Sequence, residues 1–568
     1  MNKTTLRLSA PLFVKNYDNW FIFLLSYLYI RWDLLWTGSG VGVSLFTILF
    51  CGFFYLRLNM TTPIPEDRRK AARPWLFTIA LSALSCTWFD ASNLSWFTFL
   101  FLTTAFLYWA MTLSGTRILP VLSAYLPLEL LISFLSIPFS NFGRFFGAVF
   151  RTKSYREAVA ADRDTTPDTD SPVNLSKSHG THRLLIRNLL MITLTLVILC
   201  PLFLIVLNLL AAADEEFMHM IAVLIDHFFG LFDDIFSVQI IETVGDILLA
   251  VPVACYLFGL LWAHTRPDHA KGWKTKDRVD VILASSRFVP RIMIYTALTA
   301  FSGIYLLFLA LQASHLISAL TGGLPGTTTY SAFARQGFFE LCAVSFINLM
   351  VMTGTWLVSS RKQESETESV PPALRIFLAF LSFQTILLVI TALVKMGLYI
   401  DTYGLTRLRV YTSWFMLWLL LIFAILSITH LRRALSSKGD RVVGGNRFAP
   451  AKTMTALTVI MFLTLSSLNV DALIVRDNLE RYIASQMSLE ELDLYGLIHL
   501  SDNAAMEVLD YYEESRSSTH GSRESRVVKE VERWISLVEP EHLLPREKAH
   551  LTVASLRLNH RLNTLKSQ

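Results

Sequence analysis

Charged residues are scarce in this sequence. Asp, Glu, Lys and Arg make up 17% of the 568 residues, whereas hydrophobic residues make up 53%. Soluble domains carry about a quarter charged residues, so the composition predicts a membrane protein. The net charge of +5 is scattered over short segments and forms no single basic face, which argues against a nucleic-acid partner.

Cysteine and the common catalytic motifs are also sparse. The five cysteines, Cys51, Cys86, Cys200, Cys255 and Cys342, all lie within apolar runs. They predict no disulfide framework and no cysteine-based metal site. The sequence has no Gly-x-x-x-x-Gly-Lys-Ser/Thr loop, no His-Glu-x-x-His motif and no Gly-x-Ser-x-Gly motif. We therefore expect no metal and no cofactor, and an enzyme is the less favoured class.

Long apolar runs fill most of the sequence before its C-terminal hundred residues. A bilayer core about 30 Å thick needs roughly 20 apolar residues in a helix, and only helices or closed barrels satisfy the backbone within lipid. Barrel strands have about ten residues and alternate strictly, whereas these runs are continuous and longer. The sequence thus predicts an all-α, polytopic transmembrane helical bundle of about eleven spans. The predicted spans are 20–36, 39–57, 75–89, 94–112, 188–212, 243–264, 291–315, 336–358, 374–398, 409–430 and 453–470.

Basic residues are distributed unevenly between these spans. The segments 58–74, 140–187, 265–291, 359–375 and 431–452 carry 28 Lys and Arg, whereas each loop between them carries one or none. Basic loops stay on the cytoplasmic side. The N-terminus is therefore predicted to be cytoplasmic and the C-terminus extracytoplasmic.

One apolar segment, 118–139, breaks this alternation. If it crossed the membrane, the following loop with eight basic residues would lie outside. Pro120, Pro127 and Pro138 favour an irregular segment. We interpret 118–139 as a re-entrant or interfacial helix on the cytoplasmic side.

This topology divides the chain into four regions. Residues 1–139 form an N-terminal membrane block, and 140–186 form a cytoplasmic loop that is partly disordered because its middle is polar and rich in Pro, Ser and Asp. Residues 187–471 form a seven-span membrane block. Residues 472–568 form a small extracytoplasmic helical domain, hereafter the tail.

Ionisable residues within spans are candidates for function, because burying them in lipid is costly. We expect Arg31 to pair with Asp33, and Lys395, near the end of its span, to extend toward the interface. The set comprises Arg31, Asp33, Glu129, Asp246, Glu340 and Lys395.

A polar cluster is predicted at the outer ends of the last spans, and two interpretations of it remain open. It is either a structural network that clamps the spans, or a site for an anionic lipid headgroup or glycan. We expect Arg407 or Arg409 to reach Glu340, and the tail to pack on a patch that includes Tyr330, Arg335 and Tyr403. The cluster comprises Tyr330, Arg335, Glu340, Asp401, Tyr403, Arg407, Arg409, Tyr411, Asn469 and Asp471.

Five short motifs in this part of the chain resemble the signature blocks of a known family. They are LLAAADEEF at 209–217, RQGFFEL at 335–341, YGLT at 403–406, NVDALI at 469–474 and LDLYGLIHLS at 492–501. The resemblance is to a bacterial family of polytopic membrane proteins known only as a domain of unknown function, and it covers about residues 190–510. Asn478 matches a second tail asparagine of the family pattern. The resemblance implies a fold and a location in the bacterial cytoplasmic (inner) membrane, and no activity.

Three classes of function stay open. The leading hypothesis is a non-enzymatic protein of the cell envelope that senses or scaffolds through the outer cluster and the tail. Its partners are the lipid bilayer and, at the outer face, an envelope protein or an anionic headgroup or glycan. The alternatives are a secondary transporter and a membrane-embedded transferase. A continuous polar cavity at mid-membrane depth favours transport, whereas an apolar bundle with polar groups at its outer rim favours scaffolding.

Overall fold

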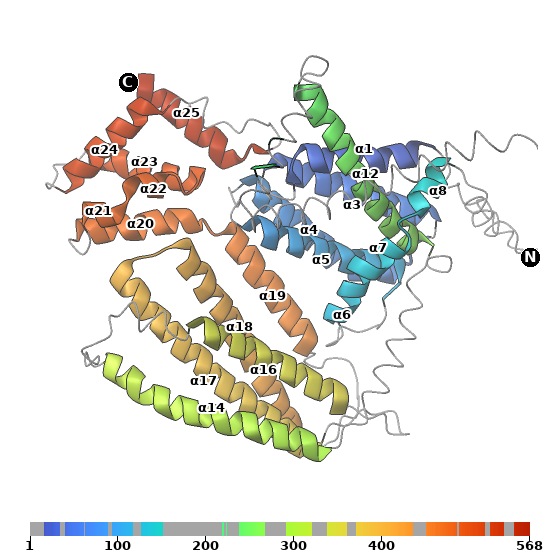
Figure 1. Cartoon of the computed structure of the whole chain (residues 1–568), viewed down its shortest axis with the longest axis horizontal. Coiled ribbons are helices and arrows are strands. Elements are labelled where there is room, and N and C mark those ends of the chain that lie inside the picture. Colours follow the sequence, from blue (N-terminus) through green and yellow to red (C-terminus); the bar gives the residue numbers. More distant parts are fainter. Residues whose placement is uncertain are drawn as a thin grey trace, which may run out of the picture.

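Helices form all the regular secondary structure in the part of the chain that the structure describes. The structure is a computed structural model, and it shows two helical bundles side by side with the tail at one end of both (Figure 1). The predicted all-α class is confirmed for these residues. The described residues are 16–34, 40–61, 63–88, 94–117, 126–150, 219–220, 223, 238–266, 291–320, 338–359, 371–435, 450–484, 488–516, 523–538 and 550–567.

The first bundle combines the N-terminal helices with one helix from much later in the chain. Its core is aromatic, with Phe54, Trp109, Phe258 and Trp262 fully buried. The later helix, α12, packs along α1 and supplies Phe258 and Trp262, so residues far apart in sequence share one core. The helices are α1 (Asn16–Arg31), α3 (Val41–Thr61), α4 (Glu66–Trp88), α5 (Ser95–Ser114), α6 (Leu126–Leu131), the π-helix η2 (Ile132–Ser136), α7 (Ile137–Ser140), α8 (Arg144–Phe150) and α12 (Val238–Thr265).

The second bundle is built around a long helical hairpin. Leu381, Leu388 and Phe423 are fully buried between the two arms of this hairpin and its neighbours. Gly404 makes the tight connection, with φ +74° and ψ −178°, a conformation that is essentially restricted to glycine. The helices are α14 (Arg291–Leu320), α16 (Phe338–Ser359), α17 (Pro372–Tyr403), α18 (Arg407–Leu435) and α19 (Pro450–Ser467), and α17 and α18 are the arms.

Helix α19 joins the two bundles. Trp414 and Trp418 of α18 donate their indole N–H groups to the Met461 carbonyl (3.2 Å) and the Thr458 hydroxyl (3.0 Å) of α19. On its other side, the Phe462 ring stacks on Phe101 of α5 with 4.0 Å between ring centroids. The bundles therefore contact each other through a shared helix.

Six helices of the described chain are long and apolar enough to cross a membrane, and the bent pair of α19 and the following helix raises the count to seven. The count of eleven is not confirmed. Helix α1 has only 16 residues, and α4 begins with a charged turn at Glu66 and Asp67. The predicted span 188–212 and most of the loop 140–186 lie outside the described residues. The six are Val41–Thr61, Ser95–Ser114, Glu242–Thr265, Ile292–Ala310, Pro372–Tyr403 and Arg407–Leu435.

The described part of 118–139 is a short, irregular helix. Residues 126–140 form α6, η2 and α7 in succession, with Pro138 in the first turn of α7. The apolar helical stretch Glu129–Ser140 is shorter than the roughly 20 residues that a span needs. This geometry is compatible with a re-entrant or interfacial segment.

Helix α20 begins at Val470, directly after α19, where the chain bends by 60°, and the whole of α20 is counted with the tail from here on. The helices of the tail share one hydrophobic cluster that includes Val475, Leu509, Val531 and Leu558. The far end of the tail returns to the first bundle, since the Val41 N–H at the start of α3 donates to the Leu551 carbonyl (3.1 Å). The tail helices are α20 (Val470–Ile483), α21 (Leu489–Leu492), α22 (Leu494–Ile498), α23 (Asp502–Arg516), α24 (Glu524–Leu537) and α25 (Val553–Ser567).

Candidate functional site

A two-point ion pair joins the hairpin to the tail. Arg407, the first residue of α18, donates from Nε to Asp471 Oδ1 (2.6 Å) and from Nη2 to Asp471 Oδ2 (2.7 Å). Asp471 lies in the first turn of α20 and is buried. Arg407 Nη2 also donates to the backbone carbonyl of Leu500, just after α22. One guanidinium thus links three elements, and the planar fork matches the carboxylate at two points.

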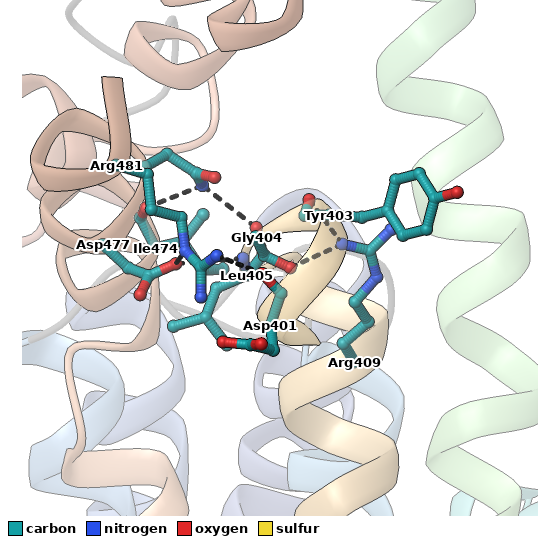
Figure 2. Close-up of polar contacts among 9 residues, drawn as sticks. Asp401, Tyr403, Gly404, Leu405, Arg409, Ile474, Asp477 and Arg481 are labelled. Carbon is teal, nitrogen blue, oxygen red and sulfur yellow. Dashed lines mark hydrogen bonds and ion pairs between the residues drawn. The ribbon is translucent and has the colours of Figure 1, made fainter. Parts of the chain in front are cut away.

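A second set of contacts ties α20 to the turn of the hairpin (Figure 2). Asp477 Oδ2 accepts from the Leu405 N–H (3.2 Å) and from Arg481 Nε (2.9 Å). Arg481 Nη1 donates to the Asp401 carbonyl (2.6 Å), and Asn478 Nδ2 donates to the Leu405 carbonyl (3.0 Å). Backbone groups at the end of α17 and in the connection are therefore satisfied by side chains of the tail.

Arg409 forms contacts within the hairpin. Its Nη1 donates to the carbonyls of Tyr403 (2.8 Å) and Gly404, at the C-terminal end of α17. Its guanidinium carbon lies 4.1 Å from the centroid of the Tyr399 ring (a cation–π contact). A positive group at the C-terminal end of a helix satisfies free carbonyls and complements the helix dipole.

The remaining predicted residues fall into two groups. Asn469 is the N-cap of α20, where its side-chain oxygen accepts from the Ala472 N–H (3.3 Å). Tyr411 packs against the hydrophobic cluster of the tail. Tyr330 and Arg335 lie outside the described residues. Glu340 belongs to α16, but its side chain lies outside the described part, so its pairing with Arg407 or Arg409 stays a prediction.

We call the contacts between Arg407 and Asp471, and between Leu405, Asp477, Asn478 and Arg481, the hairpin–tail clamp. The two arginines of the clamp, Arg407 and Arg481, are already engaged within the chain, by carboxylates and by backbone carbonyls. Among the residues that the structure describes, no three His, Cys, Asp or Glu are placed to hold a metal ion. The geometry therefore supports a structural junction more directly than an anionic ligand site.

Sequence reasoning missed half of this clamp. Asp477 and Arg481 stand four residues apart, the spacing that places two side chains on one helix face. That spacing is a usable signal for a salt bridge within α20. The spacing does not predict that both side chains also form hydrogen bonds with the backbone at the α17–α18 connection, 72 to 80 residues away in sequence.

The other ionisable residues of the predicted spans include one pair that joins two helices. Arg31 at the end of α1 forms an ion pair with Asp246 of α12 (3.3 Å between Nη1 and Oδ2). Asp33 was the partner expected from the sequence, and Asp246 was not predicted. Lys395 is only 4% exposed within α17, and its extension to the interface stays a prediction. Glu129 is also buried.

A polar network without charge lies in the middle of the second bundle. The Tyr305 hydroxyl donates to Asn348 Oδ1 (2.6 Å), and Asn348 Nδ2 donates to the Thr385 hydroxyl (2.9 Å). Gln384 Nε2 donates to the Ser302 carbonyl (2.9 Å). These residues link α14, α16 and α17, and interhelical hydrogen bonds of this kind hold membrane helices together.

Comparison with known proteins assigns the chain to a family without an activity. A family model described as a domain of unknown function (DUF4153) matches residues 76–511. Neither the curated proteins nor the solved structures contain a match. The match confirms the resemblance seen in the sequence motifs and extends it into the first bundle.

Proposed function

This chain belongs to the DUF4153 family, and we propose that it is a non-enzymatic scaffold or sensor of the bacterial cytoplasmic membrane, with its tail as the working surface on the outer face. The membrane assignment rests on helices that are long and apolar enough to cross a bilayer. The working surface is proposed from the way the tail is held.

The observation that carries this proposal is the Arg407–Asp471 pair with its third contact to Leu500. A tail attached only by a flexible linker would need no such contact. Here the tail is fixed to α17 and α18 at one point and to the start of α3 at another. A partner bound to the tail therefore meets a surface of fixed position, and a force on the tail is transmitted to the membrane helices.

The distribution of charge supports the orientation. The tail lies at the end where α3 begins and where α17 ends, as Val41 and Arg407 show. The short connections at this end, 37–40 and 404–406, contain no Lys or Arg, and the basic segments 58–74 and 431–452 belong to the opposite ends of α3 and α18. By the positive-inside rule, this distribution favours a cytoplasmic location for the basic ends and an outer location for the tail.

Complementation of a deletion strain tests the proposal. We expect growth under envelope stress to be restored by the intact chain but not by a variant in which Asp471→Asn and Asp477→Asn release the tail. Arg476→Ala is the matched control, because Arg476 is on the same helix and pairs with the exposed Glu480. Full complementation by a chain that ends after Ile483 would contradict a role for the tail.

A photo-crosslinking amino acid at Tyr495 or Leu537 tests the scaffold directly, since both side chains are about 70% exposed on the tail. We expect a discrete crosslinked product in intact cells, absent when the crosslinker is at Leu431, which is exposed at the other end of α18. Products of equal yield at all three positions would contradict a specific surface on the tail.

The second candidate function is a secondary transporter, and the uncharged network of Tyr305, Asn348 and Thr385 favours it. These groups sit near the middle of three long apolar helices, the depth at which transporters bind solutes. Asn348→Leu separates the two functions. Under the scaffold proposal the variant complements as long as it folds, and under the transporter proposal it does not.

A further inference from the structure

The first bundle contains a cavity of about 600 Å³ among the helices assigned to the membrane. Its walls come from α1, α3, α4, α5, η2, α7 and α12, and three of these, α3, α5 and α12, are among the candidate spans. The lining is almost entirely carbon, with Phe46, Phe50, Leu102, Phe106 and Leu257 among the wall residues. Such a surface repels water and accepts an apolar ligand.

One hydroxyl in the wall has no partner among the described residues. The Thr98 Oγ1 is buried, and the residue is only 2% exposed. Other threonines of this bundle, such as Thr47 and Thr112, donate to the carbonyl four residues earlier in their helix. Tyr256 in the same wall donates to the Phe134 carbonyl (2.9 Å). Thr98 is a lining residue of the cavity, and its buried hydroxyl calls for a hydrogen-bond partner.

The position of Thr98 limits the kind of ligand. It lies in the first turn of α5, close to Leu34 after α1 and Val43 at the start of α3, which also line the cavity. The donor is therefore near the membrane surface, while the Phe106 and Leu257 walls lie further along the helices. At the other side, Phe139 lines the cavity and is 59% exposed, so one wall reaches the surface of the bundle.

The volume sets the size of the ligand. An engineered apolar cavity of about 150 Å³ holds one benzene, so 600 Å³ holds on the order of two dozen carbon atoms. One fatty acyl chain fits this space, whereas the two chains of a diacyl lipid exceed it. We propose that the cavity binds one acyl chain of a membrane phospholipid, whose ester carbonyl accepts a hydrogen bond from the Thr98 hydroxyl.

Photolabelling of the purified full-length chain tests this site. The probe is a phosphatidylethanolamine that carries a diazirine in one acyl chain, and labelled peptides are mapped by mass spectrometry. We expect labels on α5 and α12 around Leu102 and Leu257. Leu102→Trp should reduce this labelling about tenfold, because the indole fills the space in a closely packed wall. Labels found only on outward-facing residues would contradict the site.

Two further variants test whether the loss of labelling is specific to the cavity. Leu100→Trp is the matched control, since Leu100 is on the same helix but 58% exposed, and it should leave the labelling unchanged. Thr98→Val preserves shape and removes only the hydroxyl, so we expect labelling to fall about two- to tenfold through loss of one hydrogen bond. Unchanged labelling in both Leu102→Trp and Thr98→Val would overturn the proposal.

Competition distinguishes the source of the chain. An excess of unlabelled phosphatidylethanolamine should abolish the specific labelling, and an equal concentration of free fatty acid should not. Equal competition by the fatty acid would show that the cavity binds a free acid, and the phospholipid assignment would be wrong.

Discussion

Arg407 and Asp471 are 64 residues apart in sequence, yet their side chains meet at two points, 2.6 and 2.7 Å, at the place where the tail leaves the membrane helices. The carboxylate is the more buried partner, since its side chain is 8% exposed and that of the arginine 22%. Removal of either partner leaves the other without its match in a poorly solvated place, and such a loss is costly.

The first prediction concerns Asp471→Asn. The amide cannot accept two charge-assisted hydrogen bonds, so we expect a loss of about 2–4 kcal/mol in the free energy of unfolding. Unfolding of the purified protein in detergent by heat or denaturant measures it. The control is Glu480→Gln in the exposed Arg476–Glu480 pair, which should cost less than about 0.5 kcal/mol. Equal effects of the two variants would show that the clamp does not stabilise the fold.

The second prediction concerns Arg407→Lys. Lysine keeps the charge but loses the planar fork that contacts both carboxylate oxygens and the Leu500 carbonyl. We expect a loss of stability of about 1–2 kcal/mol, smaller than that of Asp471→Asn because an ion pair remains. A lysine variant as stable as the intact chain would mean that charge alone, and not bidentate geometry, holds the tail.

The third prediction concerns the turn of the hairpin. Gly404→Ala places a side chain at φ +74° and ψ −178°, which should cost about 1–3 kcal/mol. Gly397→Ala is the control on the same helix, because an added Cβ there meets nothing within 4 Å, and alanine favours helix by about 1 kcal/mol. The melting temperature should fall for the first variant and stay equal or rise for the second.

The fourth prediction concerns pH. Arg561 of α25 forms hydrogen bonds with Glu513 of α23 and holds the pKa of that carboxyl below its ordinary value. A lowered pKa means that the folded state binds protons more weakly than the unfolded state. The pair therefore stabilises the tail above the ordinary glutamate pKa of about 4.3, and this contribution is lost as the pH falls below that value. Hydrogen exchange of α25, measured at pH 6 and at pH 3, values that bracket about 4.3, should show this loss of stability. Glu513→Gln should reduce the difference in stability between the two pH values.

The sequence was sufficient for the class and the family, because both depend on local patterns. Apolar runs of span length predicted helices close to the observed α14, α17 and α18, and the YGLT and NVDALI motifs led to the family. The number of spans could not be predicted in the same way. Hydrophobicity does not fix the ends of a helix, so the predicted first span, 20–36, only overlaps α1 (Asn16–Arg31), which has 16 residues.

Long-range partners could not be predicted from spacing. The partners that the structure gives Arg407, Asp471 and Leu500, were not predicted, because only folding of the tail brings them together. The network of Asn348 and Thr385 was missed because single uncharged polar residues leave no periodic signal in an apolar run. A cavity depends on the shapes of side chains from several helices, and no pattern in one helix reveals it.

The central claim is that the tail is held in one position against the membrane helices. It is tested most directly by the distance between spin labels at Leu435→Cys, the last residue of α18, and Tyr495→Cys in α22, in a chain whose native cysteines are replaced by alanine. Both side chains are well exposed. We predict a single narrow distance distribution that broadens when Asp471→Asn and Asp477→Asn are introduced. A broad distribution in the chain with its clamp intact would contradict the claim.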